Sequence, residues 1–524
     1  MKSTAKSIGI VMIITVFSRL LSLVSSMVYI TYYGISLEMD IYSYAIQLPN
    51  IIFTSLGSAL AYIVIPIFAG YIGTDQKDRA FKFADNVITI SSLFTLILSI
   101  TGIIVAPAIL ALTRFRDQGY DFALISVRIM FPVMIFYGLS FIFQGMLQSF
   151  GNYNMPALIS VPSSLTVILY VYIFGSRFGI KGLLVATFIG LMFQALILVP
   201  SIWRAGYRYK PSVQFGNKDV KEALRLAPAV VVSASAYQLN MLFNTTLSAN
   251  FKDTVSIMTT VQNLVLYAIL AFVYSVTSVV FPKLTMMAAR NDMEGFKNNL
   301  LNVINLIIYF LVPATAGFIA VSRQLFDLLY GWGRVTAGNV SLAGSFLALY
   351  ALGITGIGIK EVIDRAFYSL KDTKKPAING VIIMTVNVIA SLTLIKLADF
   401  FGLPKAFGIP AGYSVSAITG AIVLIRMIKK KIGNFGGKEV TLTYIKIVAA
   451  SVIMFIAIIP ISHMVNSYAT GSTVLHKGIR LMVPTVVGAL VYFTATYFLK
   501  VQQVTNIISG IKGWAKKALI NKKN

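Results

Sequence analysis

The residue that raises the first chemical question is Arg19, near the middle of the apolar run IVMIITVFSRLLSLVSSMVYITYY at residues 10–33. A charge at the centre of a bilayer costs about 3 kcal/mol on insertion scales. A guanidinium group stays charged and presents several N–H donors in a planar fork, which suits the oxygens of an anion. Arg19 therefore either faces a water-filled cavity and binds such an anion, or its long side chain reaches a helix carbonyl or the interface.

Several other chemistries find no support in the sequence. The chain has no cysteine, and neither His463 nor His476 has a Cys or carboxylate spaced as a second ligand, so we expect no metal site. No Gly-x-x-x-x-Gly-Lys-(Ser/Thr) motif occurs, which argues against ATP as the driving force. We place none of the 18 acidic residues in the middle of a span, where proton-coupled carriers usually need one. We therefore expect no cofactor, with the membrane potential or a monovalent cation as the driving force.

Helices in a membrane must position these residues. The chain has 524 residues, of which 57% are hydrophobic and 12% charged, and its mean hydropathy is +0.81. Soluble domains have about 25% charged residues. We predict an all-α polytopic membrane protein with about 14 transmembrane helices. They lie near residues 8–33, 41–72, 86–112, 123–149, 156–176, 182–203, 223–250, 254–282, 299–322, 338–359, 376–396, 406–426, 441–462 and 479–499. The hydrophilic stretches between them are too short for a soluble catalytic domain, so we predict no enzyme.

The distribution of charge predicts the orientation. If the N-terminus is cytoplasmic, most of the 44 Lys and Arg residues fall in cytoplasmic loops, helix ends and the C-terminal tail. The positive-inside rule therefore favours N- and C-termini that are both cytoplasmic. It also explains the net charge of +26 without nucleic acid as a partner. The tail at residues 501–524 has apolar residues at helical spacing, which predicts an amphipathic helix at the cytoplasmic surface.

Two segments, residues 143–184 and 364–409, resemble each other. Each has a helix end, a short polar loop, a proline that opens the next helix (Pro156, Pro376), an apolar run and a Phe-Gly turn. Repeated halves are common in transporters, with the substrate site between them. We therefore predict an N-lobe of six helices at residues 1–204, a C-lobe of six helices at 205–430, and two further helices at 431–500.

Four stretches, in order, resemble the MurJ/MviN family of lipid II flippases, within the multidrug/oligosaccharidyl-lipid/polysaccharide exporter superfamily. Ser18-Arg19-Leu20-Leu21 is similar to the Ser-Arg-x-Leu-Gly motif of that family. MDIYSYAIQLPNIIF (39–53) and LLYGWGRVTAGNVSLAGSFLALYALG (328–353) resemble two further motifs. DRAFYSLKDTKKP (364–376) is similar to the family's Arg-Ala-Phe-Tyr-Ala-x-x-Asp-Thr-Lys-x-Pro and is the most specific of the four.

The resemblance implies two lobes of six helices facing each other in a V, and two C-terminal helices that line a groove for a lipid tail. It implies that lipid II, the undecaprenyl-pyrophosphate-linked peptidoglycan precursor, moves from the inner to the outer leaflet by alternating access. Arg19 would bind the pyrophosphate, and four polar residues would line the cavity: Asn50, Thr54, Asn244 and Asn263.

The sequence departs from the family at several charged positions. Asn263 replaces an arginine of the eighth helix, and Asn244 an aspartate of the seventh. Asn244, Asn387 and Ser391 match a sodium site of some members, but a cation site with no carboxylate would be weak. Asp40 matches a family position; we interpret it as a loop residue on the outer side that gates the mouth by pairing with a base of the opposite lobe. Arg365, beside Asp364 and Glu361, is interpreted as part of an ion-pair cluster that gates the inner end.

Other functions stay open from the sequence. The cargo could be another lipid-linked glycan, such as a teichoic-acid or capsule precursor, because family arginines are missing. A cation-coupled multidrug exporter and a non-transporting scaffold for cell-wall assembly are further alternatives. We expect a monomer in the bacterial cytoplasmic membrane, with a lipid-linked saccharide pyrophosphate and membrane lipids as partners, and contact with the cell-wall synthesis machinery.

Overall fold

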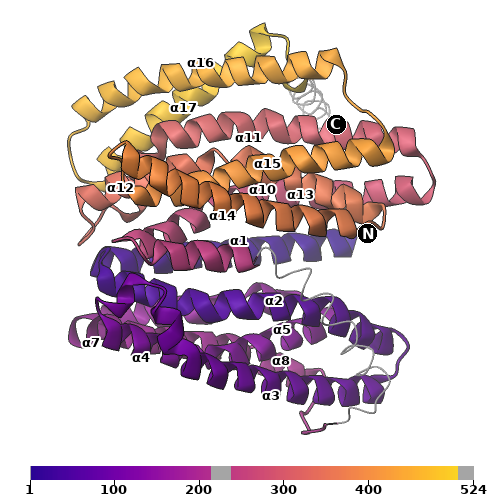
Figure 1. Ribbon diagram of the computed structural model, residues 1–524. Coiled ribbons are helices and arrows are strands. Elements are labelled where there is room, and N and C mark those ends of the chain that lie inside the picture. Colours follow the sequence, from indigo (N-terminus) through magenta and orange to yellow (C-terminus); the bar gives the residue numbers. More distant parts are fainter. Residues whose placement is uncertain (1, 214–237, 506–524) are drawn as a thin grey trace, which may run out of the picture. The chain divides into compact units, whose positions relative to one another are not determined.

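The computed structural model describes residues 2–213 and 238–505, which form helices and the turns between them (Figure 1). The all-α fold class is thereby confirmed. The chain divides into two compact units, Met1–Ile257 with Trp332–Thr336, and Met258–Gly331 with Ala337–Asn524. In each unit the long helices run roughly parallel to one another (Figure 1).

The first unit is a helical bundle with an aromatic core. Tyr44, Phe53, Phe131 and Met134 are at most 2% exposed and belong to one buried cluster. Its helices are α1 (Lys2–Tyr33), α2 (Leu37–Gly73), α3 (Lys77–Leu110), α4 (Tyr120–Met130), α5 (Val133–Ser149), α6 (Asn154–Ala157), α7 (Val161–Leu196) and α8 (Val199–Arg204). A short 3₁₀ turn, η1 (Arg114–Arg116), joins α3 to α4, and residues 238–248 are also helical.

The helical stretch α7 contains two predicted spans, the fifth and the sixth. The chain reverses at Gly179, whose φ of 60° and ψ of −152° are not helical. The two arms then pack antiparallel, and Gln194 on the second arm donates to the hydroxyl of Ser163 on the first at 2.6 Å. Near the reversal, the Tyr170 hydroxyl donates to the Gly179 carbonyl at 2.7 Å.

The first unit extends beyond residue 204, where we placed the boundary of the N-lobe. Side-chain hydrogen bonds explain this extension. The hydroxyl groups of Tyr44 and Thr246 lie 3.4 Å apart, and the amide of Asn250 donates to the Leu112 carbonyl at 3.3 Å. The division at 204/205 thus stays a prediction about lobes, while the compact units divide at 257/258.

The second unit is built around α15. Its helices are α10 (Thr254–Ala289, which begins in the first unit), α11 (Met293–Tyr330), α12 (Ala337–Ala351), α13 (Ile354–Ser369), α14 (Lys374–Phe400), α15 (Gly408–Ile432), α16 (Lys438–Tyr468) and α17 (Val474–Phe498). The short turn η2 (Lys405–Phe407) precedes α15. α15 packs against α12, α13 and α14, and α11 packs against α16 and α17.

Small residues allow α14 and α15 to approach closely. Gly408, Gly412, Ser416 and Gly420 are spaced by four and therefore lie on one face of α15. A Cβ atom on Gly412 would lie 2.6 Å from the backbone nitrogen of Ser391 on α14. Contact of this kind between small residues is the usual basis of tight helix pairs in membranes.

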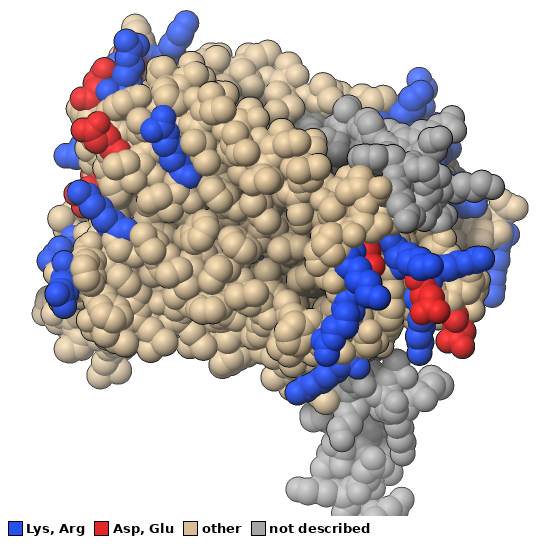
Figure 2. Space-filling model, turned by 90° about the horizontal axis from the view of Figure 1, so that it is seen from below, with Lys and Arg blue, Asp and Glu red and all other residues tan. Residues whose placement is uncertain are grey.

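The helices fit a membrane in length and composition. Ten helical stretches of the described chain are long and apolar enough to cross it, or eleven if the bent pair α12–α13 is one span. Large apolar side chains such as Ile13, Ile104 and Leu490 are more than 60% exposed, as expected for a surface that contacts lipid. On the face shown in Figure 2, charged residues gather toward two ends and leave a broad band of other residues between them. The number fourteen stays a prediction.

The two sequence repeats have the same turn near their start. The residue after the last helical turn is left-handed in each, with φ of +79° at Gly151 and +56° at Lys371. The next residue, Asn152 or Asp372, donates its N–H to the carbonyl five residues earlier, at 2.8 and 2.9 Å. The side chain of that residue accepts the N–H three residues later, at 3.4 and 3.3 Å. The repeat is therefore present in the structure as a helix-ending Schellman-type turn followed by an Asx cap.

Part of the sequence prediction lies outside the described residues. The amphipathic helix expected at residues 501–524 falls almost entirely there, and so does much of the span expected at 223–250. The two C-terminal helices expected at 431–500 are present as α16 and α17, which pack against each other.

Candidate functional site

Arg19 lies on an exposed face of α1, within the candidate span Ile10–Tyr33. Its neighbour Ser18 is 2% exposed and donates to the carbonyl of Ala157 at 2.8 Å, which fixes the adjacent face of α1 against α6. One turn further, the hydroxyl groups of Ser22 and Ser164 lie 3.2 Å apart. Because successive helical residues point about 100° apart, Arg19 stands next to this packed seam and not in it. The guanidinium is therefore not sealed within a dry bundle.

Asn50 and Thr54 lie one turn apart on α2. Asn50 is exposed and Thr54 is half-buried. The Thr54 hydroxyl donates to the Asn50 carbonyl at 2.7 Å and lies 3.4 Å from the side-chain oxygen of Asn50. The pair presents amide and hydroxyl groups that can donate to and accept from a sugar or peptide.

Asp40 occupies a different environment from the one predicted. It is 0% exposed, in the first turn of α2, whereas we expected a solvated loop residue. Its carboxylate accepts the guanidinium of Arg114 at 2.8 Å, and it accepts the backbone N–H and the hydroxyl of Ser256 at 2.9 and 2.7 Å. Arg114 belongs to the predicted N-lobe, so the expected ionic partner from the opposite lobe is replaced by one from the same compact unit. Three strong donors explain how the carboxylate tolerates complete burial.

Arg365 does not form the predicted ion pairs. Lys360 is the cation of this cluster: its ammonium lies 2.7 Å from Asp364 and 3.8 Å from Glu361. Lys360 and Asp364 are one turn apart on α13 and share a face, but Glu361 and Arg365 have the same spacing, so the spacing alone does not decide which pair forms. The guanidinium of Arg365 instead lies over the ring of Tyr274, 5.5 Å from its centroid.

The remaining predicted polar residues lie on separate elements. Asn244, in the helical residues 238–248, is 2% exposed and belongs to the first unit. Asn263 is half-buried on α10 in the second unit. Asn387 and Ser391 are completely buried on α14, and the Ser391 hydroxyl donates to the side-chain oxygen of Asn387 at 3.3 Å. A cation site at Asn244, Asn387 and Ser391 stays a prediction. Within the described residues, no three His, Cys, Asp or Glu side chains are grouped as metal ligands.

The sequence analysis did not predict two sets of contacts near the turn between α1 and α2. The segment Trp332–Thr336 belongs to the first unit, and the N–H of Arg334 donates to the Thr31 carbonyl at 2.9 Å. Gly34 and Gly333 have φ of +76° and +60°, and a Cβ atom on Gly333 would overlap the Thr31 carbonyl oxygen. Glycines in the motif at residues 328–353 thus serve a close backbone approach. The second set is that of Arg114 and Ser256 with Asp40. Its one sequence signal was a basic loop predicted to lie on the same side of the membrane as Asp40.

The architecture defines the class of protein. One solved structure with this fold is lipid II flippase MurJ in an inward closed conformation; it has 23% identity, a TM-score of 0.77, and a match over 94% of this chain and 98% of that one. Another is a multidrug resistance MATE family transporter of the MOP superfamily in an inward-facing conformation. It is 18% identical to this chain with a TM-score of 0.63, and the match covers 79% of this chain and 94% of that one. The chain therefore shares the fold of these two proteins, and its long apolar helices indicate a multi-pass membrane protein.

The family follows from the sequence match. The family model described as lipid II flippase MurJ matches residues 29–478, and the chain belongs to that family. A probable lipid II flippase MurJ of Treponema pallidum is 25% identical over 508 residues, which are 94% of each chain. A probable lipid II flippase MurJ of Rickettsia prowazekii is 22% identical, over 94% of this chain and 97% of that one. The predicted family is thereby confirmed.

Proposed function

We propose that this protein is a flippase that moves lipid II from the inner to the outer leaflet of the bacterial cytoplasmic membrane by alternating access. The observation that carries the proposal is membership of the MurJ family over residues 29–478. A flippase translocates its cargo without breaking a bond, so the protein is a transporter and not an enzyme. In this proposal both termini are cytoplasmic, as the distribution of Lys and Arg favours.

Arg19 supplies the central chemistry of the proposal. A guanidinium exposed in the middle of an apolar helix is costly in lipid, and a hydrated anion removes that cost. The pyrophosphate of lipid II provides several oxygen acceptors, and Arg side chains bind such groups through two parallel hydrogen bonds. Asn50 and Thr54 on α2, with Asn244 and Asn263, would contact the sugar and peptide. The groove for the polyprenyl tail would lie on α16 and α17, which expose many large apolar side chains.

The driving force in this proposal is the membrane potential, with no cofactor. A binding site that carries positive charge gains about 2.3 kcal/mol per charge per 100 mV when it moves through the field. A monovalent cation at Asn387 and Ser391 is the alternative, and its neutral ligands predict weak binding. The expected partners are lipid II, membrane lipids and the cell-wall synthesis machinery, and the expected state is a monomer.

The proposal is tested in cells that depend on this protein as the flippase for lipid II. Depletion should trap lipid II in the cytoplasmic leaflet, and wild-type protein should restore its exposure at the outer surface. Arg19→Ala should lower the rate of exposure about tenfold or more, because hydrogen bonds to charged groups contribute about 1.5–3 kcal/mol. Arg19→Lys should be intermediate, since it keeps the charge and loses the planar fork.

Arg128→Ala is the matched control, because Arg128 is also an exposed arginine within a candidate span, on α4. It should leave the rate unchanged. Unaltered lipid II topology after depletion would contradict the proposal. Failure of this protein to rescue a strain depleted of its own lipid II flippase would instead indicate another lipid-linked glycan. Cation-coupled dye efflux that survives Arg19→Ala would indicate a drug exporter.

A further inference from the structure

A short segment that begins in the last turn of α8 forms a surface that the proposed transport mechanism does not use. We call residues 203–213, WRAGYRYKPSV, the basic strap. α8 ends at Arg204, and Gly206 has a φ of +91°, so the chain turns back sharply at this point. A left-handed residue of this kind is the usual device for ending a helix.

The basic strap is anchored on α3 from one side. Tyr207 is 1% exposed, and its hydroxyl donates to a carboxylate oxygen of Asp85 at 2.6 Å. The backbone N–H of Lys210 donates to the same oxygen at 2.9 Å. Asp85 is 6% exposed, so this carboxylate is a buried anchor. Burial and the adjacent carboxylate raise the pKa of Tyr207, which keeps the phenol a hydrogen-bond donor.

A second set of bonds continues the attachment one turn along α3. Ser212 donates its backbone N–H to the Thr89 hydroxyl and its own hydroxyl to the Asn86 side chain, both at 3.3 Å. The hydroxyl groups of Thr89 and Tyr209 lie 2.9 Å apart. The strap is therefore held in one conformation by three positions of α3, and its remaining side chains have a defined direction.

The other side of the strap is aromatic and basic. Trp203 is 53% exposed and Tyr209 is 45% exposed. Arg204, Arg208 and Lys210 are exposed, and the guanidinium of Arg208 lies over the Trp203 ring, 4.7 Å from its centroid. The strap contains no Asp or Glu, and none of the salt bridges among the described residues involves its three cations.

This combination fits one partner. Trp and Tyr are enriched where a membrane protein crosses from hydrocarbon to headgroups, and Lys and Arg near a membrane surface are attracted to anionic lipids. The strap lies at the end of the candidate span that ends at Arg204, which places it at the boundary between hydrocarbon and headgroups. We propose that the basic strap is a preformed binding surface for the headgroups of acidic glycerophospholipids, with phosphatidylglycerol as the probe.

The test measures phosphatidylglycerol bound to the full-length protein by native mass spectrometry, with phosphatidylcholine as the neutral comparison. Arg208→Ala/Lys210→Ala should weaken the binding of phosphatidylglycerol about thirtyfold, since it removes two charges and each charge near an anionic surface is worth about 1 kcal/mol. The binding of phosphatidylcholine should not change. Lys210 holds Asp85 through its backbone N–H, so the anchor survives in this variant.

Arg177→Ala/Lys181→Ala is the matched control, because it also removes one exposed lysine and one arginine that lies over an exposed aromatic ring, Phe178, at 5.4 Å. Equal losses in the two variants, or unchanged binding in the first, would overturn the proposal. Weaker binding of a polyprenyl pyrophosphate in the first variant, with phosphatidylglycerol unaffected, would also overturn it and assign the strap to the cargo. The inference does not depend on the proposed function. The binding of phosphatidylglycerol to the Arg208→Ala/Lys210→Ala variant and the exposure of lipid II in cells that carry this variant are separate measurements.

Discussion

Two charged residues of the first unit show how differently a membrane helix can hold a charge. Asp40 is completely buried, and Arg114 and Ser256 donate all the hydrogen bonds that compensate it. Removing one partner of such a buried pair costs about 3–5 kcal/mol, which makes Asp40 a structural residue of this unit. Arg19 is exposed within an apolar helix instead. A guanidinium at such a position suits a hydrated or anionic environment, which agrees with the role that the transport proposal gives to Arg19.

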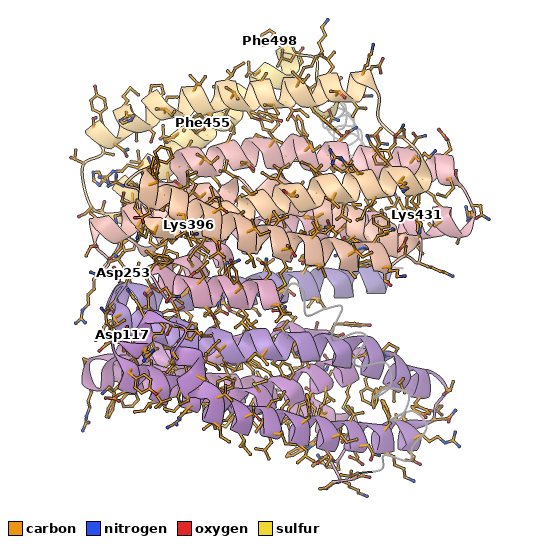
Figure 3. All side chains as sticks on the ribbon, viewed as in Figure 1. Asp117, Asp253, Lys396, Lys431, Phe455 and Phe498 are labelled. Atoms are coloured by element: carbon orange, nitrogen blue, oxygen red, sulfur yellow. The ribbon has the colours of Figure 1, made fainter. Side chains whose placement is uncertain are left out.

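At the same scale, the ion pair between Asp372 and Lys431 gives a prediction for pH. Figure 3 labels Lys431 at the end of α15, and Asp372 lies in the loop between α13 and α14. The hydrogen bond from Lys431 lowers the pKa of Asp372 below its ordinary value. A lowered folded-state pKa adds stability above the ordinary pKa of about 4, and this stability is lost as the pH falls through the folded value.

Asp372→Asn should therefore lower the melting temperature of the purified protein at pH 6–8, and the difference from wild type should shrink as the pH falls below about 4. The loss at neutral pH should be below about 1 kcal/mol, because the Lys431 side chain is 37% exposed. Asp399→Asn is the control, since the pair of Asp399 and Lys405 is more than half exposed and should contribute little. A difference in melting temperature that does not depend on pH at all would exclude the ion pair as its cause.

At the scale of elements, spacing in the sequence was informative where the relevant contact is local. The repeat at residues 143–184 and 364–409 predicted equivalent turns, and both turns have the same hydrogen bonds because those bonds join residues three to five apart. The run of small residues on α15 is also periodic. The spacing does not indicate which helix this face of α15 contacts, and only the structure identifies α14 as its neighbour.

The close approach of α14 and α15 makes a prediction for glycine. Gly412→Ala should destabilise the protein by about 1–3 kcal/mol, because its Cβ atom would lie 2.6 Å from the backbone nitrogen of Ser391 and the helices must separate. Gly478→Ala on α17 is the control, since no atom lies within 4 Å of its Cβ position. It should be neutral or stabilising, as expected for alanine in a helix. Equal melting temperatures for the two variants would contradict tight packing of α14 on α15.

At the scale of the whole molecule, the long apolar helices follow from the bilayer that surrounds them. A bilayer requires every backbone group to be hydrogen-bonded within its own segment, and helices satisfy this requirement. Exposed apolar side chains on α1, α3, α7, α16 and α17 are the surface that such a solvent demands. The orientation across the membrane depends on charges in loops, and it is a proposal that can be tested directly.

The chain has no cysteine, so any introduced cysteine is its only thiol. Gln76→Cys and Asn434→Cys lie in loops predicted to be cytoplasmic, and Gln118→Cys and Ser467→Cys lie at positions predicted to be outside. A membrane-impermeant maleimide added to intact spheroplasts should label the second pair and leave the first pair unlabelled until the membrane is opened. The reverse pattern would place the N-terminus outside and would reverse the proposed direction of the helices.

The sequence by itself determined the helical membrane class, the repeat, the family and the unusual position of Arg19. These follow from composition, from local spacing and from motifs that occur in order along the chain. Tertiary structure decided that Asp40 pairs with Arg114, 74 residues away, and with Ser256, 216 residues away. It also decided that Lys360 rather than Arg365 holds Asp364, and that Asp85 anchors the basic strap. The physical reason is that a hydrogen bond needs two groups within about 3 Å, and only the packing of helix faces brings distant residues so close.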